Sequence, residues 1–251
     1  MARVPPARAA PGRGRLLVYR ADGVRDALRI FREVVARSPR DLSCQAVLKL
    51  DDSGSPMLGI APCYTSASDD PDELRLLRAA PGLVEDGVKE HDFRAQQTLF
   101  GDTYGVGRNY WKGHFVRELS DELIDALLAR IAALGHPPGG ILIESLHGAP
   151  KEAEASGAAV GFRDAAFNVS AMAAWLDAEL DDEHIEWARS TAAAIEPWAV
   201  SGGYLNYMPA DELIERVRAA FGRESFERLQ ALKRRYDPDN VLRRNQNIPP
   251  S

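Results

Sequence analysis

The segment Tyr204-Leu-Asn-Tyr207 holds the side chains of this chain best suited to proton chemistry. A tyrosine hydroxyl has an ordinary pKa near ~10, so it takes a proton from a poor acid only where neighbouring groups stabilise its phenolate. A strand is predicted over residues 204–208, with Tyr204 and Asn206 on one face and Tyr207 on the other. The three polar groups then converge only if the strand bends or ends near Asn206. The alternative is a pair of half-buried tyrosines with solvated hydroxyls.

A second set of polar residues lies in a strand predicted over residues 109–118. Tyr110, Lys112 and His114 alternate onto one face of it and together could bind an oxygen-rich substrate. A solvated polar face is the alternative.

Other residues that could take part in catalysis or binding give weaker signals. Ser170 carries an unperturbed hydroxyl that cannot act as a base at neutral pH. Glu144 and His147 share a predicted strand, but the strand alternation sends their side chains to opposite faces. The glycine-rich segment 101–107 lacks the strand-before, helix-after context of a dinucleotide fingerprint. We find no metal-binding constellation.

The composition bounds the class of protein. A chain of 251 residues, 45% hydrophobic and 27% charged, is long enough for a sizeable globular core. Its net charge of −6 argues against nucleic acid as a partner. No apolar run approaches the roughly 18 to 20 residues that span a bilayer, and residues 1–14 lack the apolar core of a secretory signal. A cytoplasmic protein with a disordered start is expected, without a membrane partner.

The first half of the chain predicts a strand (16–19), a helix (22–36) and a β-hairpin. The hairpin joins 42–50 to 57–64 around Ser53-Gly54, with Cys44 opposite Cys63 on one face. In a reducing compartment both thiols are expected to be free.

The second half predicts further helices and strands. The helices are 71–79, 120–134, 182–195, 211–221 and 224–235, and the strands are 109–118, 140–146, 159–162, 166–175 and 204–208. Runs of adjacent strands favour an α+β fold, a largely antiparallel sheet with helices covering one face and a C-terminal helical extension. We divide the chain into a tail (1–14), a sheet domain (15–201) and a C-terminal segment (202–251).

Several motifs resemble the berberine-bridge-enzyme-like FAD-linked oxidases, from about residue 16 to 250. The most specific are Tyr204-Leu-Asn-Tyr207, Tyr236-Asp-Pro-Asp-Asn240 and Asn245-Gln-Asn-Ile248. The segment 108–114 is similar to a family strand usually written Tyr-Trp-Lys-Ser, with Gly113 in place of the serine. In the segment 159–175, Arg163 falls on the family pattern, whereas Ser170 stands where many members carry Gln or Glu.

The resemblance implies roles for these residues. Tyr207 corresponds to a tyrosine that some members use as the base, and Tyr204 and Asn206 lie at the flavin and substrate face. The set Tyr110, Lys112, His114, Arg163 and Ser170 is expected to bind substrate. Because some members place a catalytic carboxylate at the position of Ser170, this departure leaves Tyr207 as the preferred base.

In full-length relatives an upstream domain holds most of the FAD. The resemblance therefore implies the substrate-binding part of an FAD-dependent oxidoreductase acting on an alcohol, sugar or secondary-metabolite carbon. Without a flavin domain we expect it to be inactive and to bind no FAD tightly, since it has no phosphate cradle at a helix N-terminus. Its partners would be a small-molecule substrate and a separate flavin-domain chain, or a second copy of itself. The alternative is a non-catalytic remnant or small-molecule binding module.

Overall fold

One antiparallel sheet forms the body of the protein. The computed structural model describes residues 12–20, 22–65, 71–91, 93–99, 107–135, 139–148, 151, 163–200 and 202–250. The strands follow the order β5 (Leu83–Asp86), β2 (Leu17–Arg20), β4 (Pro56–Tyr64), β3 (Leu42–Leu50), β8 (Gly139–Ser145), β9 (Phe167–Trp175) and β7 (Arg108–Val116). Two short strands, β1 (Gly12–Gly14) and β6 (Lys89–His91), extend the sheet beside β4. Residues 12–14, assigned to the tail by sequence, thus pair in the sheet.

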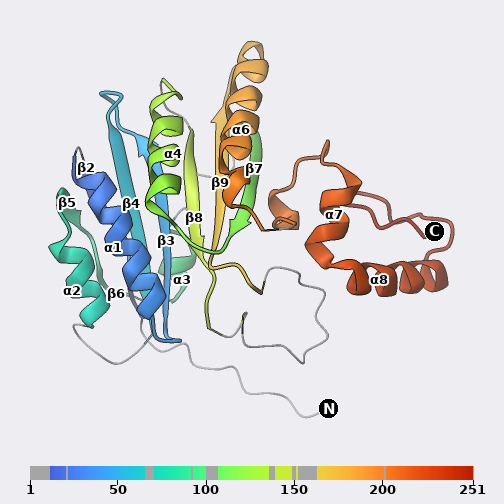
Figure 1. Cartoon of the computed structure of the whole chain (residues 1–251), viewed down its shortest axis with the longest axis horizontal. Coiled ribbons are helices and arrows are strands. Elements are labelled where there is room, and N and C mark those ends of the chain that lie inside the picture. Colours follow the sequence, from blue (N-terminus) through green and yellow to red (C-terminus); the bar gives the residue numbers. More distant parts are fainter. Residues whose placement is uncertain are drawn as a thin grey trace.

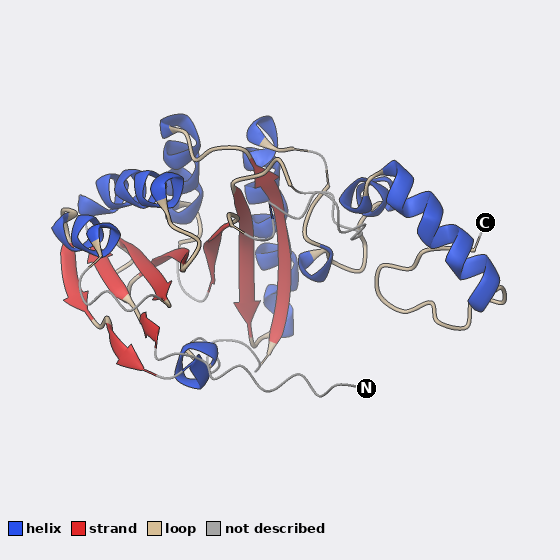
Figure 2. Cartoon of the chain, turned by 90° about the horizontal axis from the view of Figure 1, so that it is seen from below, coloured by secondary structure: helices blue, strands red, loops and turns tan. Residues whose placement is uncertain are grey.

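Helices cover one face of this sheet (Figure 1). They are α1 (Gly23–Arg37), α2 (Asp72–Ala79), α4 (Asp121–Ala132) and α6 (Asp181–Ile195). α4 begins where Ser120 accepts a hydrogen bond from the Leu123 amide at 3.2 Å, so Ser120 is the N-cap of this helix. A short helix, α3 (Phe93–Gln97), follows β6. The predicted α+β class, with a largely antiparallel sheet and helices on one face, is confirmed (Figure 2).

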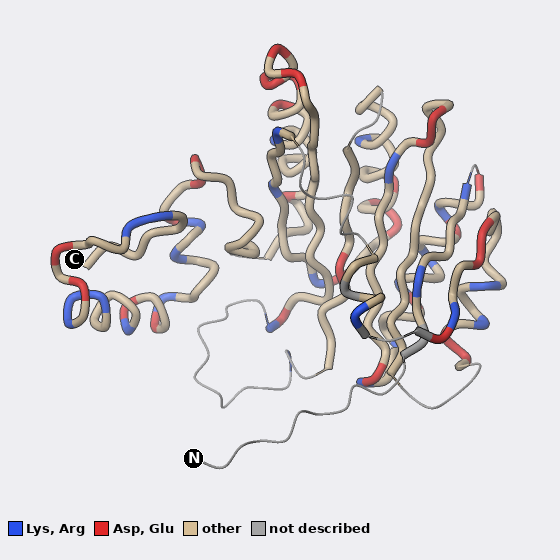
Figure 3. Tube along the Cα trace, turned by 180° about the vertical axis from the view of Figure 1, so that it is seen from behind, with Lys and Arg blue, Asp and Glu red and all other residues tan. Residues whose placement is uncertain are grey.

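The main core lies between the sheet and these helices. Alternate strand residues such as Ile141, Ile143 and Val169 point into it and are fully buried, opposite Phe31 and Leu127. The residues between them, on β8 and β9, therefore face the other side of the sheet. Many of the charged residues belong to the helices or lie near the ends of strands, while the middle of the central strands is largely uncharged (Figure 3).

The C-terminal segment extends beyond the β7 edge (Figure 1). It contains a single 3-10 turn, η4 (Leu205–Tyr207), then α7 (Ile214–Phe221) and α8 (Arg223–Tyr236). Gly222 joins the two helices with φ +76°, a left-handed conformation that suits glycine. The predicted C-terminal helical extension is confirmed.

The motif after α8 has a structural explanation. Asp237 accepts hydrogen bonds from the amides of Val241 (2.7 Å) and Leu242 (3.0 Å), which closes a loop at the helix end. Asn240 and Asn245 have φ +52° and +57°, and asparagine tolerates this left-handed region better than most residues.

Two local predictions are wrong. The hairpin loop has five residues, 51–55, so Cys63 pairs with Ser43 and Cys44 with Pro62. This shift of one residue sends the two thiols to opposite faces of the sheet. Residues 204–208 form the turn η4 and no strand. The strand predicted at 159–162 lies outside the described residues. None of the helices in the described part of the chain combines the length and apolar character needed to span a bilayer.

The register of the hairpin predicts unequal thiol reactivity. Burial raises the pKa of the fully buried Cys44 thiol, whereas Cys63 is only half-buried. We expect iodoacetamide to label Cys63 first in the folded protein and Cys44 only on unfolding, as followed by peptide mass spectrometry. A Cys63→Ser control should stay unlabelled until denatured, and early labelling of Cys44 would contradict this register.

Candidate active site

The η4 turn brings together the three polar groups of the Tyr204-Leu-Asn-Tyr207 motif. The Tyr204 and Tyr207 rings meet edge to face with centroids 4.8 Å apart. Asn206 Nδ2 donates to Tyr204 Oη at 2.9 Å. A strand would have separated Tyr204 from Tyr207, whereas a turn of about three residues returns the chain to the same side. The motif therefore forms one compact polar and aromatic cluster.

This cluster contacts the face of the sheet that the helices leave uncovered. Tyr207 Oη donates to Glu144 Oε1 at 3.2 Å, and Asn168 Nδ2 donates to Glu144 Oε2 at 2.7 Å. Glu144 and Asn168 are direct cross-strand neighbours on β8 and β9. Trp111 of β7 packs edge to face against the Tyr207 ring, with centroids 4.8 Å apart. The Tyr207 side chain thus contacts β8 through its hydroxyl and β7 through its ring.

The electrostatics of Glu144 differ from those of a surface carboxylate. Burial raises its pKa, while hydrogen bonds from Asn168 and Tyr207 act in the opposite direction. Sequence alone assigns Glu144 no partner, because strand alternation separates its side chain from that of His147. Its partner Tyr207 lies 63 positions further along, and no local pattern joins the two residues.

Ser170 lies on the same face and is almost fully buried. It is paired across the sheet with Gly113. A β-carbon at position 113 would lie 2.4 Å from Ser170 Oγ and 2.3 Å from the Val169 carbonyl oxygen, so a side chain there requires a shift of β9. A small cavity lies at this point. Its lining comprises Gly113, Asn168, Ser170, Tyr204, Tyr207, Met208, Glu212 and Arg216.

Tyr110, Lys112 and His114 share a face, but it is the opposite one, toward α6. Tyr110 Oη donates to Asp211 Oδ1 at 3.2 Å and accepts from Arg189 Nε of α6 at 3.2 Å. Arg189 also pairs with Asp211. The structure therefore does not bring these three residues together with Ser170 on one face of the sheet.

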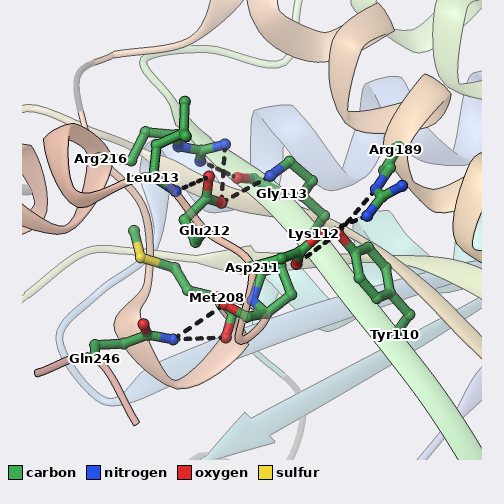
Figure 4. Close-up of polar contacts among 11 residues, drawn as sticks. Tyr110, Lys112, Gly113, Arg189, Met208, Asp211, Glu212, Leu213, Arg216 and Gln246 are labelled. Atoms are coloured by element: carbon green, nitrogen blue, oxygen red, sulfur yellow. Dashed lines mark hydrogen bonds and ion pairs between the residues drawn. The ribbon is translucent and has the colours of Figure 1, made fainter.

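Lys112 holds the C-terminal segment through a buried carboxylate (Figure 4). Its Nζ lies 2.8 Å from Glu212 Oε2, and the Glu212 side chain is 3% exposed. Arg216 Nη1 lies 3.4 Å from the same oxygen, and its Nη2 donates to the Gly113 carbonyl at 2.9 Å. Gln246 Nε2 donates to the Met208 carbonyl at 2.9 Å, so the tail also ties back to this segment.

His114 is buried behind this ion cluster. Burial lowers the pKa of its imidazole to about 4, and the positive charges of Arg216 and Lys112 act in the same direction. Its neutral ring is therefore part of the packing at neutral pH.

Arg163 belongs to no helix or strand. It sits half-buried in the turn that precedes β9. Within the described residues, no group of three or more His, Cys, Asp or Glu side chains could hold a metal ion.

Comparison with known proteins relates the chain to FAD-linked oxidoreductases. The model described as "Berberine and berberine like" matches residues 203–249, the segment that holds the tyrosine motif. The FAD-linked oxidoreductase YgaK of Bacillus subtilis (strain 168), itself uncharacterized, is 26% identical over 180 residues. The chain is thus similar to berberine-bridge-enzyme-like FAD-linked oxidoreductases, through a family model at its C-terminal segment and through relatives along most of its length.

Solved structures of this berberine-bridge-enzyme-like fold match nearly the whole chain. One is 6-hydroxy-D-nicotine oxidase from Arthrobacter nicotinovorans, at a TM-score of 0.78 and 20% identity. Another is the C166A variant of berberine bridge enzyme, at 0.80 and 18%. Each alignment covers 96% of this chain but only 55% and 56% of the two structures. The alignment with YgaK covers 70% of this chain and 39% of YgaK. The chain thus spans about half the length of the structures that it matches.

Two neighbouring acids of the C-terminal segment, Glu212 and Asp211, test how much the burial of an ion pair matters for the free energy of unfolding. Glu212→Gln leaves Lys112 and Arg216 without their buried carboxylate, and we expect a loss of about 3 kcal/mol in the free energy of unfolding. Asp211 is 50% exposed, so Asp211→Asn should cost less than about 1 kcal/mol. Urea unfolding of both variants measures the difference. Equal losses would show that the Lys112–Glu212 pair does not anchor the segment.

The neutral His114 predicts a dependence of stability on pH. Its pKa of about 4 in the folded chain lies below the ordinary 6.5, so the unfolded chain binds more protons between these values. Folding stability should therefore fall as pH drops from 7.5 to 5, with His114 contributing about 2 kcal/mol of the loss. Urea unfolding of the wild type and His114→Gln at both pH values isolates this share. A His114 imidazole signal in nitrogen NMR that titrates near pH 6.5 would contradict the lowered pKa of this residue.

Proposed function

We propose that this chain is the substrate-binding part of an FAD-dependent oxidoreductase that oxidises an alcohol, sugar or secondary-metabolite carbon. The observation that carries the proposal is the Tyr207 hydroxyl, held by Glu144 on the helix-free face of the sheet and enclosed by the Trp111 and Tyr204 rings. A positioned hydroxyl beside a hydrogen-bond acceptor is the arrangement that proton removal from a substrate alcohol requires.

The residues of this face fit a flavin ring. Tyr204 is 38% exposed and offers a planar aromatic surface, and Asn206 adds an amide beside it. A bound flavin would accept hydride from the substrate carbon. Tyr204 and Asn206 would hold its ring, and Tyr207 would take the substrate hydroxyl proton.

Substrate binding divides between the two faces in this proposal. Ser170 and Asn168 would contact the substrate beside Tyr207, because both border the same small cavity. Four further residues would support the substrate pocket from the surrounding structure: Tyr110, Lys112, His114 and Arg163. Lys112 does so by anchoring the segment that holds Tyr207.

The flavin-binding part is proposed to dock on the C-terminal extension. Large apolar side chains are exposed there, at Leu232, Tyr236, Val241 and Leu242. Single exposed apolar residues are ordinary, but four along one helix and its loop favour a covered surface. A self-associated form would use the same surface, and a cytoplasmic location suits both.

Replacement of the Tyr207 hydroxyl tests the proposal. The chain would be combined with the flavin-binding domain of a berberine-bridge-enzyme-like relative and offered a panel of sugars and benzylic alcohols. Tyr207→Phe should lower kcat by about 10²- to 10⁴-fold with little change in KM, since only the proton acceptor is removed. Bleaching of the flavin absorbance under anaerobic conditions measures the step.

Ser170→Ala is the control, because it changes a hydroxyl of the same cavity that cannot act as a base. Its effect should be much smaller than that of Tyr207→Phe. Equal losses of activity from both changes would mean that the base had been assigned to the wrong element. No turnover by the wild type, with substrate still bound, would favour a binding module.

A further inference from the structure

The cavity beside Tyr207 has room for about one water molecule. The space open to the centre of a water molecule is about 10 Å³, and one buried water needs roughly 10 to 15 Å³ on this measure. Gly113 helps to keep the space open, because a β-carbon at this position would lie 2.4 Å from Ser170 Oγ. Most of the lining residues carry polar side chains, whereas cavities that stay dry are apolar. The cavity therefore suits one small polar group.

Two buried oxygens of β9 border this cavity with a poor hydrogen bond between them. Ser170 Oγ donates to Asn168 Oδ1 at 3.5 Å, which is longer than the roughly 2.5 to 3.0 Å of a good O–H···O bond. Ser170 is 1% exposed and Asn168 3%. In the part of the chain that the structure describes, no other hydrogen bond reaches either oxygen. Buried polar groups are normally satisfied, so these two oxygens require a further partner.

The partner must both donate and accept a hydrogen bond. Asn168 Oδ1 needs a donor, because Nδ2 of the same amide is bonded to Glu144 Oε2 at 2.7 Å. The Ser170 hydroxyl can then donate to an oxygen in the cavity. A carboxylate or ether oxygen cannot donate to Asn168, and an ammonium group would approach the Arg216 guanidinium, which borders the same cavity. A water molecule or an alcohol hydroxyl satisfies both buried oxygens.

We propose that this cavity is a subsite for a single hydroxyl group, filled by a water molecule in the free chain and by a second hydroxyl of the substrate in the complex. The substrate part rests on the proposed function, in which Tyr207 takes a proton from the first hydroxyl. Tyr207 borders the same cavity, and the cavity has space for only one oxygen. The two hydroxyls therefore lie on neighbouring carbons. The subsite narrows the substrate class to vicinal diols and disfavours alcohols with a single hydroxyl.

The first measurement needs no flavin. A crystal structure of the chain, at a resolution that shows ordered water, should contain one water molecule within hydrogen-bond distance of both Ser170 Oγ and Asn168 Oδ1. Ser170→Ala should lose most of the density of this water, because one of its two partners is removed. The control Ser55→Ala, in the exposed hairpin loop, should keep it. A dry cavity in the wild type would overturn the proposal.

The second measurement compares alcohols that differ by one hydroxyl, in the chain combined with a flavin-binding domain. 1-Phenyl-1,2-ethanediol and 1-phenylethanol form one pair, and an aldose with its 2-deoxy analogue forms the other. We expect kcat/KM to be at least about tenfold higher for the member with the neighbouring hydroxyl, since this group completes the hydrogen bonds of two buried oxygens. In Ser170→Ala this ratio should fall toward one, whereas Ser55→Ala should retain it.

Failure of this inference and failure of the proposed function give different results. A ratio near one in the wild type, with turnover that Tyr207→Phe abolishes, would overturn the subsite and leave the proposed function intact. Turnover of no compound would reject the proposed function, and the dissociation constants of each pair then decide the inference. Equal affinity for both members overturns it, and about tenfold tighter binding of the diol supports it.

Discussion

The Glu212 carboxylate, enclosed between Lys112 and Arg216, is the contact on which the site depends. It joins the C-terminal segment to β7, and the same segment carries the η4 turn with Tyr207. A buried ion pair adds little net stability, because desolvation offsets the attraction. Any other placement of the segment, however, would leave a charge buried without its partner. The pair therefore selects one position for the segment along the edge strand, and the position of the Tyr207 hydroxyl follows from it.

The pleat of β7 places the residues that anchor the C-terminal segment on one face of the strand and the residues beside Tyr207 on the other. Tyr110, Lys112 and His114 face α6 and the acids of the C-terminal segment, while Trp111 and Gly113 face Tyr207 and Ser170. Because β7 ends the sheet, one strand can hold the segment with one face and support its tyrosines with the other. Gly113 is needed where these functions meet, since a β-carbon would enter the space of Ser170.

The sequence predicts most helices and strands, because their signals are local. The periodicity of α4 and its Ser120 cap lie within a few residues of each other, and the β3–β4 hairpin is bounded by turn residues. The hairpin register depends on whether its loop has an odd or even number of residues, which composition does not reveal. Tyr204 to Met208 has the aromatic character of a strand, yet tertiary contacts with Trp111 and Glu144 favour a turn. The Glu144–Tyr207 contact joins distant positions and has no local signal.

The source of the carboxylate separates this site from the arrangement that the family resemblance implies. There the position of Ser170 holds a longer Gln or Glu in many members, and the acid–base group then arises from β9. Here the small Ser170 and Gly113 leave a cavity, and the carboxylate comes from β8, held by Asn168. The cavity beside Tyr207 is bordered by the small Ser170 and Gly113 and also by the paired charges of Glu212 and Arg216. The strand that supplies the carboxylate therefore decides on which side of Tyr207 this cavity lies, because the hydroxyl is held from β8 while the small side chains of β9 and β7 border the open space.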